Sequence, residues 1–183
     1  NLDVIDVDGA ANFAADVTFA DGADIITASA GTSNFRAGVN AGNSIESGGN
    51  YNVVVGDEAG TAITTGDENV AVGFGALNAV TTGGYNTGIG SGALDANTTA
   101  SNNTGIGFAA LGANTTGTRN TAVGALAGDA LTTGGYNVAL GAYSLTTATT
   151  GTGNIAIGDA ALNLLTTGDY NVAIGQNSLD ANT

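Results

Sequence analysis

The amino-acid sequence predicts an all-β fold: a parallel β-solenoid, or β-roll, with 17-residue coils, assembled as an intertwined or side-by-side homotrimer. A pentapeptide, Asn-x-x-(Val/Ile/Leu)-Gly, recurs eight times at intervals of 17 residues without a slip. The repeat is rich in glycine and β-branched residues, which are poor helix formers. One position in each repeat is nearly always alanine or glycine, which indicates that a second backbone approaches it closely.

Each repeat has the length of one solenoid coil. Numbered from its asparagine, the consensus reads N-(V/T)-(A/G)-(I/V)-G-x-x-A-L-x-A-x-T-T-G-x-Y. Seventeen residues are too few for two packed helices, but at about 3.3 Å per strand residue they form a narrow coil with two short strands and two turns. Coils stacked about 4.8 Å apart make a rod on the order of 40 Å long. The opening asparagines are Asn52, Asn69, Asn86, Asn103, Asn120, Asn137, Asn154 and Asn171.

The apolar positions suggest which side of the chain is buried. Position 4 is always aliphatic, and we expect it to face the solenoid interior. Position 2 shares that face, whereas position 3 is small and points the other way. A strand that is apolar on both faces is usually buried on both, so three chains around an axis would cover position 3. Leucine at position 9 closes the second side, with gaps at Gly60 and Gly128. The position-4 residues are Val55, Val72, Ile89, Ile106, Val123, Leu140, Ile157 and Ile174.

The regular polar positions are interpreted as structural. Glycine at position 5 is expected at a turn with positive φ, which costs glycine little. The asparagines at position 1 are expected to form a ladder, each amide bonded to the ones above and below it. Stacking of identical coils requires this kind of regularity.

The chain divides into three parts. Residues 1–33 carry Asp-Gly turns between short apolar runs and are predicted to be an irregular β segment similar to a fibre shaft. Residues 34–51 are predicted to be an adaptor or degenerate first coil. Residues 52–183 hold the eight regular coils.

Composition excludes most catalytic chemistry. The chain of 183 residues has no histidine, no cysteine and no lysine, so it lacks the usual nucleophile pairs, imidazole bases and thiolate metal ligands. Asp6 and Asp8 resemble the start of a calcium loop whose later ligands are missing. We therefore predict no enzyme activity, no catalytic residues, no cofactor and no metal. The net charge of −14 disfavours nucleic-acid binding, and no apolar run is long enough for membrane insertion.

One column of aromatic residues is a candidate binding site. Tyr51, Tyr85, Tyr136 and Tyr170 occupy position 17, just before the asparagine. Exposed tyrosine rows stack on sugar rings, so this column is the candidate contact for a cell-surface glycan or other host receptor. The alternative is that the rings cover a turn or pack at a subunit boundary.

The repeat resembles a known family of fibres. The stretches N-I-A-I-G at 154–158 and N-V-A-I-G at 171–175 are similar to the S-V-A-I-G-x-x-(S/A) head repeats of trimeric autotransporter adhesins, and to stretches in phage tail fibres. The resemblance covers residues 52–183 and implies a left-handed β-roll in a homotrimer. The adhesin repeat is usually a few residues shorter, so the coil of this chain is expected to be wider or to have a longer Thr-Thr-Gly turn.

The resemblance implies an extracellular protein on a virion or bacterial surface, which forms a projecting part of a fibre or mediates attachment to a cell surface. One alternative is a purely structural filament subunit without a receptor. Another is an ice-binding solenoid, for which two threonine rows would have to share one plane. The two threonine positions are adjacent, so on a strand they would point to opposite faces.

Overall fold

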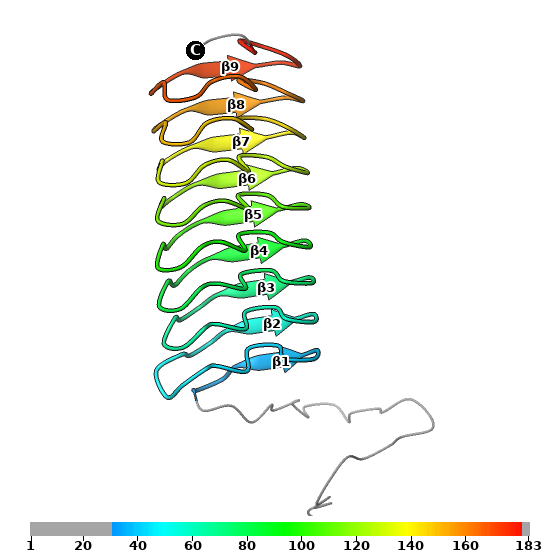
Figure 1. Ribbon diagram of the computed structural model, residues 1–183, viewed down its shortest axis with the longest axis vertical. Helices are drawn as coiled ribbons and strands as arrows, with labels where there is room; N and C mark the ends of the chain where they lie inside the picture. Colours follow the sequence, from blue (N-terminus) through cyan, green and yellow to red (C-terminus); the bar gives the residue numbers. More distant parts are fainter. Residues whose placement is uncertain (1–30, 181–183) are drawn as a thin grey trace, which may run out of the picture.

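The computed structural model describes residues 31–180 as one continuous solenoid (Figure 1). The predicted shaft-like segment at 1–33 lies outside the described residues except for its last three, as do Asp6, Asp8 and the end of the last coil. The described residues contain nine short strands and no helix. The strands are β1 (Phe35–Ala37), β2 (Val53–Val55), β3 (Val70–Val72), β4 (Thr87–Ile89), β5 (Thr104–Ile106), β6 (Thr121–Val123), β7 (Val138–Leu140), β8 (Ile155–Ile157) and β9 (Val172–Ile174).

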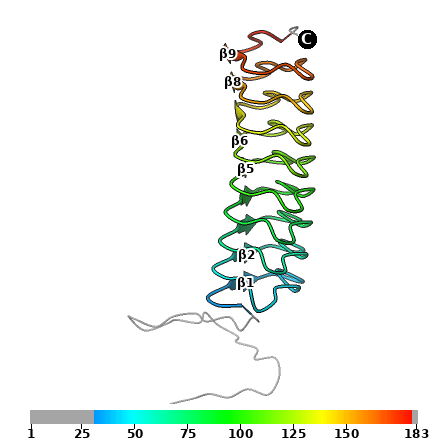
Figure 2. The ribbon, with the colours of Figure 1, turned by 90° about the vertical axis from the view of Figure 1, so that its left-hand side faces the viewer.

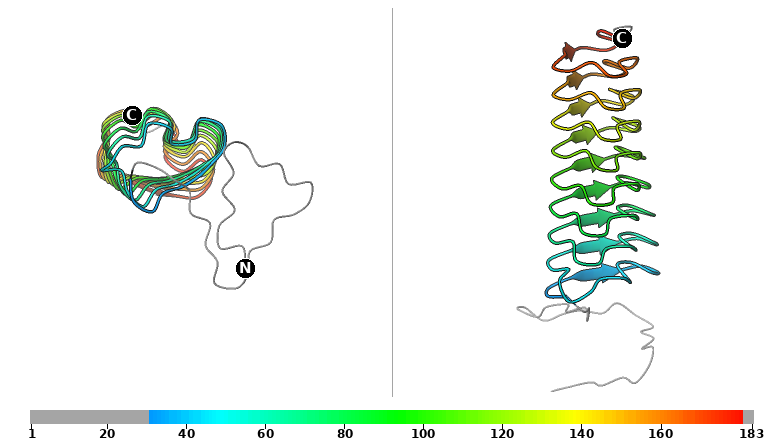
Figure 3. Two further views of the ribbon diagram at one scale, coloured as in Figure 1. Left: turned by 90° about the horizontal axis from the view of Figure 1, so that it is seen from below. Right: turned by 60° about the vertical axis from the view of Figure 1, so that its left-hand side comes forward.

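All nine strands form one parallel sheet in sequence order. From β2 to β9 each strand pairs with the residues 17 places further along, as Val70 pairs with Thr87, while β1 is offset from β2 by 18 residues. The strands stack along the rod in two perpendicular views (Figures 1 and 2). Seen along the axis, the coils superimpose closely, so that each repeat position forms a column on the rod (Figure 3).

Each coil contains one strand, and the prediction of two was wrong. After the strand the chain turns repeatedly, because positions 7, 9 and 17 have left-handed backbone angles, as at Leu77 (φ 52°) and Tyr85 (φ 61°). An extended segment cannot continue through such residues. The turns still bond from coil to coil, as where the Leu77 nitrogen donates to the Ala93 carbonyl at 3.0 Å. The stack is therefore hydrogen-bonded well beyond its sheet.

The predicted orientation of the strands was also wrong. The middle residue of each strand from β2 to β9, at position 3, is buried inside its own coil, and positions 2 and 4 face outward. A side chain on Gly88 would come within 3.1 Å of the Ala93 carbonyl and 3.0 Å of the Leu77 side chain. The small residues thus fit a narrow interior against the opposite wall of the chain's own coil. They need no second chain to cover them.

Larger side chains from the rest of the coil fill the interior. Leucines at position 9 are fully buried from the β3 coil to the β8 coil wherever leucine is present. At Gly60 the space is taken by Val54 and Ile63, and a side chain added there would meet Ile63 at 2.8 Å. At Gly128 the neighbouring side chains are Leu111 and Leu131. Bulk missing at position 9 is thus supplied from other positions, and the interior stays close-packed.

The asparagines at position 1 form a continuous buried ladder. The Oδ1 atom of Asn52 accepts from the backbone nitrogen of Asn69 at 2.9 Å and from its side-chain amide at 3.1 Å. The same side-chain amide of Asn69 also donates to the Gly83 carbonyl at 2.9 Å. Each asparagine therefore joins three segments of backbone, and the start of every strand is fixed to the coil before it.

The first coil differs from the others at its interior strand position. Arg36 stands at position 3 of β1, where every other strand has valine, alanine or glycine. Its Nε atom donates to the carbonyl of Ala41 at 2.7 Å. Arg36 pairs with Val54 of β2 on one side only, because β1 is an edge strand of the described sheet, and inward-pointing charges are a common way to protect a sheet edge.

Candidate interaction surfaces

The outward face of the sheet is apolar along the rod. From β2 to β9 every residue at positions 2 and 4 is valine, isoleucine, leucine or threonine, and none of them is fully buried. Val53, Ile89 and Val123 are more than a third exposed. We call this surface, positions 2 and 4 of β2–β9, the sheet face. A face of this kind without a charge on it is typical of an interface rather than of a solvated surface.

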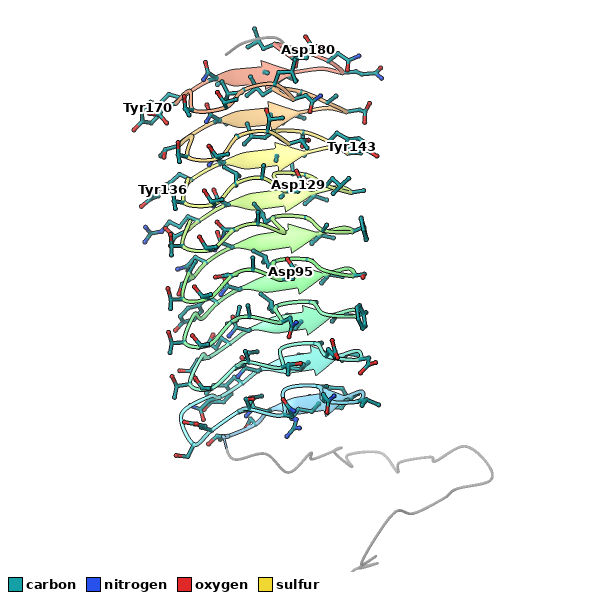
Figure 4. All side chains as sticks on the ribbon, viewed as in Figure 1. Asp95, Asp129, Tyr136, Tyr143, Tyr170 and Asp180 are labelled. Atoms are coloured by element: carbon teal, nitrogen blue, oxygen red, sulfur yellow. The ribbon has the colours of Figure 1, made fainter. Side chains whose placement is uncertain are left out.

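The tyrosine column borders the sheet face on the side where the strands begin. All four predicted residues are exposed: Tyr51, Tyr85 and Tyr136 by 55–59% and Tyr170 by 78%. Each has a φ between 57° and 61°, so the backbone turns there and the side chain leaves the rod. Tyr136 and Tyr170 both project from the same edge in Figure 4. We call position 17 the tyrosine edge.

Two tyrosines of this edge rest on residues one coil below them. The Nη1 atom of Arg119 donates to the hydroxyl of Tyr136, and its guanidinium lies 5.2 Å from the ring centroid. The ring of Tyr170 lies over Gly153, where an added side chain would meet it at 2.7 Å. These contacts hold the two rings along the rod axis and leave their outer faces exposed.

A second aromatic edge, which sequence reasoning missed, borders the sheet face where the strands end. Phe74 and Phe108 at position 6 are 59% and 60% exposed, and Tyr143 at position 7 is 49% exposed. Tyr143 projects on the opposite side from Tyr136 and Tyr170 (Figure 4). We call positions 6 and 7 the phenylalanine corner. The signal was present in the sequence, because Phe74 and Phe108 share one repeat position two coils apart, as the tyrosines share position 17.

The acidic residues near the first regular coils do not form a shared site. The Oδ1 atom of Asp67 accepts from the backbone nitrogen of Asn50 at 2.7 Å and from its side-chain amide at 3.1 Å. Asp57 and Glu58 are exposed at the other side of the strand. Within residues 31–180 no group of three or more carboxylates is placed to hold a metal ion.

Two aspartates at position 10 have a raised pKa. Partial burial raises the pKa of Asp95 and of Asp129, and hydrogen bonds from backbone amides lower it in part. The Oδ1 atom of Asp129 is buried without a hydrogen-bond partner. Gly112 stands between them in the column, so the two carboxylates lie two coils apart and do not act together (Figure 4).

The two threonine positions have different environments. At position 13 the hydroxyl donates to the carbonyl of the threonine one coil on, as from Thr64 to Thr81 at 3.1 Å. At position 14 the residues are exposed. The ice-binding alternative needs two equivalent open rows of threonine hydroxyls, but in this chain the hydroxyls of one row are hydrogen-bonded to the backbone. The exposed row is Thr65, Thr82, Thr99, Thr116, Thr133, Thr150 and Thr167.

No segment between residues 31 and 180 is a helix that could span a membrane. Comparison with protein-family models, with curated proteins and with solved structures finds no match to this chain.

Proposed function

We propose that this chain is a non-enzymatic segment of an extracellular homotrimeric fibre, either a phage tail fibre or the head of a bacterial adhesin. The segment projects other parts of the fibre or mediates attachment to a cell surface. The observation that carries the proposal is the uncharged sheet face on a straight rod whose coils carry no inserted loop.

The dimensions of the sheet face support a stable assembly. The eight strands β2–β9, about 4.8 Å apart, give a length of about 38 Å. Three strand residues and the adjoining turn residues give a width of about 20 Å. The resulting area of about 770 Å² per chain is similar to the roughly 800 Å² that each partner contributes to a stable interface.

The partner that best fits this face is another copy of the chain. A parallel copy has the same 17-residue repeat and therefore the same axial spacing of coils, so each coil of one chain can lie beside the same coil of the other along the whole rod. The chain carries 16 acidic residues and would repel its copies elsewhere, but positions 2 and 4 of the strands contain none of them. Identical chains therefore meet with least repulsion at the sheet face.

Attachment by such a rod is mechanical and multivalent. Functional pockets are usually built by loops, and the regular coils carry none long enough to wall a cleft. Contacts to a glycan or other receptor would lie along the side of the rod and repeat on three chains. Individually weak sites then give useful avidity, because each further contact is made at high effective concentration.

Two measurements on the full chain test the proposal. Sedimentation equilibrium is expected to give three times the mass of one chain, and a stable folded monomer would overturn the trimer. Intact bacterial cells are expected to retain the fluorescently labelled trimer. A trimer that binds no cells would limit this segment to projection.

A further inference from the structure

We propose that the three chains meet head to tail, with the tyrosine edge of each chain packed against the phenylalanine corner of the next. This inference rests on the proposed trimer and assigns the contact between neighbouring chains, which we call the seam. The occupant of both edges is a second copy of this chain, in parallel orientation and without an axial shift.

The two edges cannot touch within one chain. Position 17 comes six residues before position 6 of the next coil, and this nearly extended path across the sheet spans about 20 Å. The labelled rings of Tyr136 and Tyr143 project on opposite sides of the rod (Figure 4). If the residue types at the two edges of one coil complement each other, the complementarity therefore points to a contact between chains.

Such complementarity exists in the coils that carry large aromatic side chains. The β3 coil has Phe74 at one edge and Tyr85 at the other, both more than half exposed. The β5 coil has Phe108 at one edge and Arg119 at the other. In a ring of chains at equal height, these pairs face one another as an aromatic pair and a cation–π pair.

The β6 and β7 coils continue the pattern. The β6 coil carries Leu126 at the corner and Tyr136 at the tyrosine edge. The β7 coil carries Tyr143 at the corner and Gly153 at the tyrosine edge, and the Tyr170 ring from the coil above covers that glycine. An aromatic surface is thus available opposite Tyr143 even though the coil's own residue has no side chain.

Polar residues are matched as well. The β4 coil, between two aromatic coils, has Ser91 at the corner and Asn102 at the other edge. Two coils depart from the pattern: in the β2 coil Asp57 and Glu58 would face Glu68 across the seam, and in the β8 coil Asp159 and Ala160 would face Tyr170. We expect no attraction at those two levels, and the seam is held by the coils from β3 to β7.

The pairing of unlike edges fits the proposed threefold symmetry. A threefold axis in front of the sheet face brings the start of one strand next to the end of its neighbour's strand. A twofold axis along the rod would also set unlike edges against each other, because an isologous contact pairs residue i with j and j with i. The number of chains in the cross-linked product therefore decides between a closed ring of three and a pair.

Cysteine cross-linking tests the seam, because the native chain has no cysteine. The double variant Ser91→Cys/Asn102→Cys changes only the polar pair of the β4 coil. Mild oxidation is expected to give a covalent trimer on a denaturing gel, while either single variant stays uncross-linked. The pair Ser91→Cys/Tyr136→Cys, two coils out of step, is expected to stay uncross-linked too, since disulfides need Cα atoms within about 7 Å.

The outcomes separate this proposal from the proposed function. Covalent dimers from a single variant would show that like edges meet, and a sedimenting trimer without cross-links in the matched pair would show that the seam lies elsewhere. Both results overturn the seam and leave the trimer standing. A monomer by sedimentation overturns the trimer itself.

A second variant distinguishes the seam from a sugar-binding role of the tyrosines. Changing Tyr85, Tyr136 and Tyr170 together to serine is expected to raise the trimer dissociation constant by about tenfold or more, from lost aromatic pairs. Unchanged trimer dissociation with loss of cell binding would assign the tyrosines to glycan contact instead.

Discussion

The side-chain oxygen of Asn137 accepts two hydrogen bonds from Asn154, one from its backbone nitrogen at 2.9 Å and one from its side-chain amide at 3.2 Å. The side-chain amide of Asn137 donates in turn to Asn120 at 3.1 Å and to the Gly151 carbonyl at 2.8 Å. One buried side chain thus joins three coils, which explains why the ladder accepts no substitute within this chain.

Replacement of Asn137 by alanine is expected to lower the free energy of unfolding by about 3–5 kcal/mol. The substitution leaves the Asn154 nitrogen and the Gly151 carbonyl buried without partners, at about 1–3 kcal/mol each. Thermal melting followed by circular dichroism measures the change. Asn43→Ala, at an exposed position, is the matched control and should shift the melting temperature little. Equal losses of stability in the two variants would contradict a stabilising role of the asparagine ladder.

Alanine at Gly107 is expected to cost more than about 3 kcal/mol or to prevent folding. Gly107 has φ 135°, and a side chain there would lie 2.4 Å from the Gly124 carbonyl oxygen. Gly92→Ala is the control: φ is 65°, the nearest atom outside the flanking residues is 4.0 Å away, and the same column already holds Ala109. It should cost about 1 kcal/mol. Similar melting curves for both would show that stacking does not restrict position 5.

Glutamate at two adjacent strand positions should have different effects. Ala122→Glu places a charge in the interior of the coil and is expected to abolish folding. Val123→Glu lies on the sheet face and is expected to leave a folded chain that sediments as a monomer. Circular dichroism measures the folding of each variant, and sedimentation measures its oligomeric state. If Val123→Glu stayed trimeric, the sheet face would not be the interface.

Deletion of whole coils should be tolerated and deletion of part of one should not. Removing residues 103–119 joins Asn102 to Asn120, which has the same place in the ladder as Asn103, and a shorter folded rod is expected. Removing residues 103–111 puts every later column out of step and should abolish cooperative melting. Equal tolerance of the two deletions would be incompatible with the solenoid.

Stability should respond to one partly buried carboxyl. Because burial raises the pKa of Asp129 in the folded state, its ionised form destabilises the fold above that pKa, and the penalty vanishes below the unfolded value. Asp129→Asn is therefore expected to raise the melting temperature at pH 7 by about 1–2 °C, with solvent screening keeping the gain under about 0.5 kcal/mol. The gain should disappear near pH 3.

The control for this effect is Asp57→Asn, which removes the same formal charge from an exposed position. If both variants gained equally at pH 7, the cause would be reduced repulsion in a chain of net charge −14 rather than burial at Asp129.

The sequence by itself determined the solenoid. An unbroken interval of 17 residues between asparagines such as Asn52 and Asn69 leaves stacked coils as the one economical arrangement, since each residue then meets its own equivalent. The glycine at position 5 and the leucine at position 9 followed from the same repeat, because turn geometry and burial act on every coil alike.

Only the tertiary structure decided which way the strands face. Three consecutive apolar residues such as Val70, Ala71 and Val72 fit either orientation, and alternation alone cannot choose between them. The choice depends on the distance to the opposite wall, which is set by left-handed turns at residues such as Leu77 that local sequence does not disclose. That wall leaves room for glycine or alanine in every strand from β3 to β9, and for Val54 in β2 only because Gly60 lies beside it, so the larger residues of each strand face outward and the rod acquires its apolar surface.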